Sequence, residues 1–273
     1  MSNSDDKKNV FTDMEGTLNP ENESKFRPFG KDYYGPEEFM RLVRARRSVR
    51  KFDGAPIPTE IAEQCLEAGL LAPNSSNLQS WEFIRVINPE IKAKLSEACF
   101  SQSAARTASE LIVCIARTDK WKEHCELMLK EFEKFEKETG EKTPKAALAY
   151  YQKLAPFVYN VGPFSLYSPF KWLIFTLTGL FKPAPREPIT FSDLKTWSVK
   201  SCALACENIM LAYRAFGYDT CPMEGYDSKR VKKILGLSSH QHLVMILGVG
   251  KALPGGVYGP QMRFDKKLFI KTI

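Results

Sequence analysis

Apolar residues recur along the chain with two periods, one typical of helices and one typical of strands. Helical spacing, bounded by capping residues and by glycine or proline, predicts helices over 36–45, 59–71, 89–99, 119–138, 144–151, 192–216 and 228–236. Alternating or continuously apolar stretches predict strands over 81–87, 111–116 and 242–249. The sequence therefore predicts an α+β fold in which long helices surround a small sheet.

The apolar residues of each element indicate which side is buried. The continuously apolar strand 111–116 is predicted to lie in the centre of the sheet. Helix 119–138 carries one apolar seam on an otherwise charged surface, formed by Trp121, Cys125, Met128, Phe132 and Phe135. The longest helix, capped at Ser192–Asp193 and ended by Gly217, is predicted to bury Leu194, Trp197, Ser201, Leu204 and Leu211. The first helix is predicted to bury Phe39, Leu42 and Val43.

Two regions lie outside this regular pattern. Residues 1–35 are polar and lack periodicity, which predicts a tail or an arm over a partner subunit. The remainder, 36–273, is predicted to be a single domain that carries a lid or interface insertion over about 119–191. A final segment after the last strand is predicted to form an extended arm.

Six prolines punctuate residues 156–191, and between them lies the apolar run 170–181. The run is too short to span a bilayer, which needs roughly 20 apolar residues. One interpretation is a lid or a dimer-interface element. The other is an interfacial membrane anchor, with Trp172 at headgroup level and Lys171 and Lys182 flanking the run.

Composition narrows the functional classes. Of 273 residues, 44% are hydrophobic, which supports a substantial core, and the net charge of +7 suits anionic small ligands. Basic residues cluster only near 41–51 and are not interleaved with aromatic residues, which disfavours nucleic acid as a partner. Seven cysteines, no C-x-x-C motif and no signal peptide predict a cytoplasmic protein with free thiols. Cys202 and Cys206 are interpreted as core residues, and no metal site is predicted because His240 and His242 lack further ligands at metal spacing.

The candidate chemistry is concentrated near the N-terminal end of the predicted domain. Arg46, Arg47, Ser48 and Arg50 follow the first helix, and guanidinium groups match the oxygens of a phosphate. The loop 73–81 then supplies asparagine, serine and glutamine side chains, whose neutral donors and acceptors suit the edge of a heterocycle. Together these groups predict a phosphorylated, ring-bearing cofactor.

Four sequence blocks in this order resemble the nitroreductase family of FMN-dependent oxidoreductases. The first is R-R-S-x-R-x-F at 46–52, and the second is the loop Pro73 to Trp81. The third is the P-x-E-G-Y-D turn at 222–227, and the fourth is the basic position within 259–264. The blocks span about residues 37–265. Each is weak alone, whereas four in order are specific.

This resemblance implies both a fold and a reaction. The family fold is a three-layer α+β sandwich with a small, mostly antiparallel sheet, built as an intertwined homodimer with its site at the subunit interface. NAD(P)H, the electron donor, would reduce bound FMN and leave. A nitroaromatic, a quinone or a similar small-molecule acceptor would then enter the same space, which gives a ping-pong cycle.

The resemblance also implies roles for individual residues. Arg46, Arg47 and Ser48 are expected at the phosphate and ribityl end of FMN, and Arg50 at the pyrimidine edge. Gln261, where a lysine is common in the family, and Arg263 are expected to meet the phosphate from the C-terminal arm. The loop residues Pro73, Asn74, Ser75 and Asn77 are expected to come from the partner subunit.

Further positions are expected at the ring itself. Ser101 and Gln102 occupy the place where many relatives contact the pyrimidine. The backbone of Pro222, Met223, Glu224 and Gly225 is expected to lie against the redox edge, where a glycine permits close approach to a flat ring. No side chain is predicted to act as a catalytic nucleophile or acid, since the flavin carries the chemistry.

Two other functions stay open at this level. Within the same superfamily, the chain could be a reductive dehalogenase or a flavin-modifying enzyme that uses 121–191 as a lid. In a different class, it could be a membrane-docked flavin-binding protein with little turnover, in which 170–181 makes peripheral membrane contact.

Overall fold

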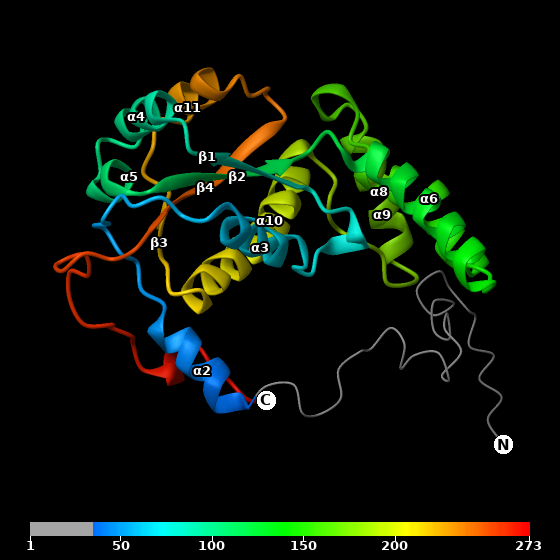
Figure 1. Cartoon of the computed structure of the whole chain (residues 1–273). Coiled ribbons are helices and arrows are strands. Elements are labelled where there is room, and N and C mark those ends of the chain that lie inside the picture. The colour runs from blue at the N-terminus through cyan, green and yellow to red at the C-terminus, as the bar shows by residue number, and fades with distance from the viewer. Residues whose placement is uncertain (1–34) are drawn as a thin grey trace.

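The computed structural model describes residues 35–273, so the predicted N-terminal arm lies almost entirely outside the described residues. Its centre is a four-stranded antiparallel sheet (Figure 1). In spatial order the strands are β1 (Trp81–Val86), β2 (Glu110–Arg117), β4 (Gln241–Gly250) and β3 (Asp219–Met223). The three predicted strands are confirmed, with ends that differ by a residue or two.

Strand β2 lies between two neighbours and is buried on both faces, as its continuous apolar run predicts. Ile112, Cys114 and Ala116 belong to the core on one face of the sheet. The intervening Leu111, Val113 and Ile115 belong to the core on the other face. Side chains alternate along a strand, so one apolar run supplies both cores.

Helices cover both faces of the sheet and make a three-layer α+β arrangement, as predicted (Figure 1). The first core contains residues of α3 (Thr59–Leu70) and α10 (Phe191–Ala215). The second contains residues of α4 (Pro89–Ala98), α5 (Ser103–Thr107) and α11 (Ser228–Leu235). The five-residue helix α5 is too short to leave a periodic signal and was not predicted.

The central helix α10 begins one residue before its predicted start. Thr190 is the N-cap residue, and it exchanges hydrogen bonds with Asp193 in a capping box. Gly217 follows the helix with a φ of 79°, as its predicted role requires. Leu204, predicted to face inward, is 49% exposed, which corrects that prediction. Ala205 and Cys206 face the sheet instead.

Strand β3 was not predicted, because Pro222 and the following residues resemble a turn. The structure places Pro222 and Met223 at the end of β3 and only the following residues in the connection. Proline is tolerated there because β3 is an edge strand and needs hydrogen bonds on one side only. Met223 packs into the core, 3% exposed.

The predicted insertion is a helical layer beside the sheet (Figure 1). It contains α6 (Trp121–Thr139), α7 (Lys145–Ala149), a π-helical turn η3 (Tyr150–Leu154), α8 (Ala155–Tyr159), η4 (Pro163–Ser165) and α9 (Ser168–Gly179). The helix predicted to end near Tyr151 continues to Tyr159. The seam on α6 is confirmed, because Cys125 is buried and Trp121, Met128 and Phe132 pack around it. Within 35–273, no helix combines the length and apolar character needed to cross a bilayer.

Two segments at the ends of the described chain have few contacts of their own. Helix α2 (Pro36–Ala45) buries no residue, and Phe39, predicted to face inward, is 54% exposed. The predicted C-terminal arm is confirmed: residues after β4 are extended, apart from the short η5 (Lys266–Leu268).

Candidate functional site

The arginine cluster and the C-terminal arm, which are about 200 residues apart in sequence, line one pocket of about 340 Å³. We call it the arginine pocket. Its walls comprise Arg46, Arg47, Ser48, Arg50 and residues 257–263. Of the predicted phosphate contacts, the structure therefore brings Arg46, Arg47, Ser48, Gln261 and Arg263 together, and Arg50 lies with them.

Backbone hydrogen bonds hold the two walls in place. The Arg50 amide donates to the Gly256 carbonyl at 2.7 Å, and the Leu253 amide donates to the Lys51 carbonyl at 2.9 Å. A Cβ on Gly256 would lie 2.9 Å from the Lys51 carbonyl oxygen, so only glycine permits this approach. On the other side, the Val49 amide donates to the Thr220 carbonyl of β3 at 3.0 Å.

The guanidinium groups of the pocket are only partly paired. Arg47 donates to the Gly259 carbonyl, and Arg50 lies over the Tyr258 ring at 4.9 Å from its centroid. The nearest carboxylate to Arg46 is Glu207, 3.8 Å from Nε. The Nη1 atom of Arg46 is buried and has no hydrogen-bond partner within the described chain. A buried donor of this kind is costly unless it is satisfied, so the pocket fits an anionic group such as a phosphate.

Strand β3 connects the arginine pocket with the predicted redox turn. Ser48 forms a β-bridge to Thr220, and Gly225 follows five residues later. Because β3 ends at Met223, a rise of about 3.3 Å per residue makes roughly 16 Å the largest separation of these positions along the chain. A phosphorylated ring compound laid along β3 could therefore reach both.

At the turn, Gln102 is held by two carbonyl groups. Its Nε2 donates to Gly225 at 2.7 Å and to Cys99 at 3.0 Å. A Cβ on Gly225 would lie 3.2 Å from this nitrogen, so the glycine permits the contact. The structure thus brings together Gln102 and the Glu224–Gly225 backbone, while Pro222 and Met223 belong to β3, and the predicted contacts of these residues with the cofactor stay predictions.

Ser101 does not line the arginine pocket, and its predicted contact with the cofactor stays a prediction. It lines a separate hollow beside α4 and α5, with Lys92, Ser96 and Arg106 among its neighbours. The backbone of Ser101 has a φ of 52°, which turns the chain between it and Gln102.

The loop 73–79 does not line the arginine pocket within the same chain. It lies at the other end of α3, against the insertion (Figure 1). Asn74 accepts from the Gln79 amide at 2.7 Å, Ser75 lies 3.3 Å from the hydroxyl of Tyr159, and Asn77 contacts Met128. Pro73 is exposed at the start of the loop. The expectation that these residues serve a partner's site agrees with this separation and stays a prediction.

Residues that the sequence analysis did not single out shape this loop. Tyr151 donates to the Ser76 carbonyl at 2.9 Å, and the hydroxyl groups of Tyr150 and Tyr159 both contact the Ser76 hydroxyl. The sequence signal that could have revealed this contact is the presence of three tyrosines within ten residues of the insertion, at 150–159. They attach the loop to the insertion, so movement of one would be transmitted to the other.

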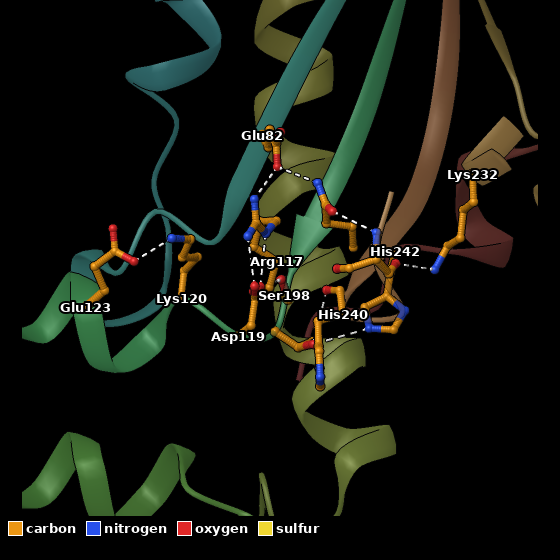
Figure 2. A network of polar contacts seen from close by, with 12 residues as sticks. Glu82, Arg117, Asp119, Lys120, Glu123, Ser198, Lys232, His240 and His242 are labelled. Carbon is orange, nitrogen blue, oxygen red and sulfur yellow. Dashed lines mark hydrogen bonds and ion pairs between the residues drawn. The ribbon is translucent and has the colours of Figure 1, made fainter. Parts of the chain in front are cut away.

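A polar network fixes the root of the insertion to the sheet (Figure 2). Arg117, at the end of β2, pairs with Glu82 of β1 and with Asp119 just before α6. Ser198 of α10 donates to the Ser80 carbonyl at 2.9 Å and so holds the end of the loop. Burial lowers the pKa of His242 to about 4, and its Nε2 lies 3.2 Å from the Thr118 hydroxyl. His242 is therefore a neutral part of this network at physiological pH.

Comparison with known proteins decides the family. A model of the nitroreductase family matches residues 43–251, which include the arginine cluster, both loops and the whole sheet. The chain belongs to the nitroreductase family. The predicted family is confirmed, and with it the α+β fold and the assignment to the oxidoreductases.

Individual nitroreductases show how far the likeness extends. A Bacillus subtilis protein that carries the provisional name NAD(P)H nitroreductase YdgI is 29% identical over 233 residues, covering 84% of this chain and 95% of its own length. The crystal structure of B. subtilis ydfN, also provisionally named a nitroreductase, has the same fold, with a TM-score of 0.69, 22% identity and coverage of 88% and 100%. A nitroreductase-like structure from Exiguobacterium sibiricum, solved with FMN, has a TM-score of 0.63, 26% identity and coverage of 86% and 97%.

Proposed function

We propose that this nitroreductase is an FMN-dependent enzyme that takes a hydride from NAD(P)H and reduces nitroaromatic, quinone or similar acceptors in a ping-pong cycle. The names of its relatives support the donor, and the relative solved with FMN supports the cofactor. Bound FMN would supply the redox chemistry, because it accepts a hydride and passes electrons on.

The arginine pocket is the observation that carries this proposal. Its cations come from two distant segments, and the buried Nη1 of Arg46 needs a partner that the described chain does not provide. Arg46, Arg47 and Arg263 would bind the phosphate, and Ser48 would bind the adjoining hydroxyl groups. Charge-assisted hydrogen bonds to guanidinium groups would contribute about 1.5–3 kcal/mol each.

The other end of the cofactor would lie along the turn after β3. The Glu224–Gly225 backbone would face the redox edge of the ring, and Gln102 would hold that backbone in place through Gly225. Arg50 would place a positive charge beside the edge on which negative charge develops. No side chain of the chain would transfer the hydride.

A homodimer would complete the site. The loop residues Asn74, Ser75 and Asn77 lie away from the arginine pocket of their own chain, so they would serve the pocket of a partner subunit. The exposed apolar residues Phe39 of α2 and Leu204 of α10 support such an interface.

Anaerobic titration of the purified, FMN-loaded protein with NADH and with NADPH tests the proposed function. We expect either nucleotide to bleach the flavin absorbance stoichiometrically, and a nitroaromatic or a quinone to restore it. Initial rates at several concentrations of both substrates should give parallel double-reciprocal lines, which a ping-pong cycle requires.

Two outcomes would contradict the proposal in different ways. Bound FMN that neither nucleotide bleaches would show a flavin-binding protein with little turnover. Intersecting lines would show that donor and acceptor occupy the enzyme together. The test also separates the superfamily alternatives, because a dehalogenase would release halide from a haloaromatic and a flavin-modifying enzyme would consume its own flavin.

A further inference from the structure

Helix α9 presents an apolar surface to solvent. Phe170, Trp172, Leu173, Leu177 and Leu180 are 48–70% exposed, and they fall on one broad side of the helix. Phe181 follows at 88%, and the turn before the helix exposes Phe164 at 98%. Leu166 and Tyr167 are exposed as well, and we call the exposed apolar residues from Phe164 to Phe181 the α9 face.

The polarity of α9 is the reverse of that of an ordinary surface helix. Its single charged residue, Lys171, is 2% exposed and faces inward beside the buried Phe175. The ammonium group of Lys171 donates to the Val158 carbonyl at 2.5 Å and to the Pro188 carbonyl at 3.0 Å. Lys171 therefore fixes the orientation of the helix and leaves the apolar side outward. This corrects the prediction that Lys171 flanks the run at a membrane surface.

The charge of the surrounding segment has one sign. Residues 142–186 contain no aspartate or glutamate, and they contain six lysine and arginine residues. Lys171 is buried, whereas Lys142, Lys145, Lys153, Lys182 and Arg186 are exposed. Lys182 directly follows the α9 face, and Arg186 lies against Gly179 at the end of the helix.

From these observations we propose that the α9 face docks this nitroreductase on an anionic phospholipid bilayer. An interfacial helix buries its apolar side by about 5–10 Å at the boundary between headgroups and acyl chains, and aromatic residues such as Trp172 favour that depth. Lysine and arginine residues near the surface each contribute about 1 kcal/mol of attraction to anionic lipid. Lys182 and Arg186 adjoin the α9 face and supply this attraction, whereas the exposed Glu187 opposes it.

The position of the α9 face distinguishes it from the proposed subunit interface. Helix α2 and the C-terminal arm lie at one end of the molecule, and α9 lies at the other (Figure 1). The apolar residues of α2 would pack in the dimer, and the loop 73–79 would meet the partner beside α6 and α8 of the insertion, whereas the apolar residues of α9 would stay available for a bilayer. A second copy on the α9 face is the alternative that the experiment must separate.

Flotation of the FMN-loaded full chain with liposomes tests the docking proposal. We expect the protein to float with vesicles of phosphatidylcholine containing about 30% phosphatidylserine, and to float much less with phosphatidylcholine alone. The variant Leu177→Glu should lower the partition coefficient by roughly tenfold or more, because it places a charge in the apolar contact. Lys182→Gln should lower it by about fivefold, since one attractive charge is removed.

Ile87→Glu is the matched control. Ile87 is 64% exposed and lies between β1 and α4, outside the α9 face, so its flotation should match that of the parent chain. Quenching by lipids brominated along their acyl chains gives a second measurement. The brominated lipids should strongly reduce the tryptophan fluorescence of the parent chain, and they should reduce that of the Trp172→Phe variant much less.

Three results would overturn the proposal. The parent could fail to float with anionic vesicles at low salt, or Leu177→Glu could float as well as Ile87→Glu. The third result is that the parent does not float but forms, without lipid, an assembly larger than a dimer that the Leu177→Glu substitution dissociates. That result would assign the α9 face to a second copy of the chain. Activity and FMN content measured without lipid should be the same in all these variants, so failure of docking does not affect the proposed reaction.

Discussion

At the scale of single residues, the role of a buried arginine or lysine depends on the hydrogen-bond partners around it rather than on its residue type. Arg46 and Lys171 each have a buried charged nitrogen. Lys171 has two carbonyl partners within the chain, whereas Nη1 of Arg46 has none. The sequence predicted a phosphate-binding role for Arg46, because its neighbours form a recognisable cluster. It could not predict the role of Lys171, whose carbonyl partners are brought close only by folding.

Lys171 makes stability depend on pH in the alkaline range. Burial lowers its pKa to about 8, below the ordinary value of 10.5 that it regains on unfolding. Between these values Lys171 binds more protons in the unfolded chain, so its own contribution to the free energy of unfolding rises with pH, by about 3 kcal/mol in all. Urea unfolding at pH 7.5 to 10.5 measures this. Lys171→Met should remove this contribution, and an identical slope in the variant would contradict it.

Arg50 should tune the cofactor rather than only hold it. Its charge would favour reduced flavin, so Arg50→Ala should lower the flavin midpoint potential by about 30 mV, equivalent to about 1.4 kcal/mol for two electrons. FMN affinity should fall as well. Arg50→Lys keeps the charge and should restore most of the potential. Unchanged potential and affinity in Arg50→Ala, measured by dye-coupled reduction and fluorescence titration, would rule out this role.

At the scale of elements, the periodicity of apolar residues predicts which face of a long helix or strand is buried. It fails where the element is short or where its apolar side faces outward. The seam of α6 and the two-faced strand β2 follow from their sequences, because each repeats over enough residues. Strand β3 is short and contains Pro222, and α9 buries its lysine while exposing its apolar side. In both, contacts from distant segments override the local signal.

A buried ion pair joins three of these elements and should dominate their stability. Glu110 of β2 accepts from Arg85 of β1 at 2.7 Å and from the Tyr213 hydroxyl of α10 at 2.8 Å. Glu110→Ala would leave a partly buried guanidinium unpaired and should lower the free energy of unfolding by about 3 kcal/mol.

Tyr213→Phe is the comparison for that variant. It removes one hydrogen bond without leaving an unpaired charge, so it should cost about 1 kcal/mol. Urea unfolding at a fixed protein concentration compares the two, because both dimerisation and FMN binding stabilise the folded state. Equal losses in the two variants would show that the ion pair has no special role.

At the scale of the whole molecule, the proposed site is divided between distant parts of the chain. The arginine pocket closes within one chain, whereas the loop 73–79 lies beside the insertion. The sequence predicted the members of both groups through family motifs. The separation of the two groups within one chain is a property of the fold, which no local pattern contains.

If the partner's loop completes the site, FMN should be released when the dimer dissociates. Dilution of the FMN-loaded protein should then free FMN in step with the appearance of monomer, whereas a site complete within one chain would release FMN over a concentration range independent of dimer dissociation. Analytical ultracentrifugation recorded at the flavin absorbance follows both species at once. A monomer that sediments with stoichiometric FMN would refute the shared site.

The most direct test of the account is the affinity for FMN of Arg46→Ala compared with Arg106→Ala. Arg106 is the matched control, because it is an exposed arginine that lines the separate hollow beside Ser101. Quenching of flavin fluorescence on binding to the FMN-free protein measures both. Loss of a charge-assisted contact of about 1.5–3 kcal/mol predicts that Arg46→Ala binds FMN roughly 10- to 100-fold more weakly, with Arg106→Ala unchanged. Unaltered affinity in Arg46→Ala, or a loss confined to Arg106→Ala, would contradict the assignment of the arginine pocket to the cofactor phosphate.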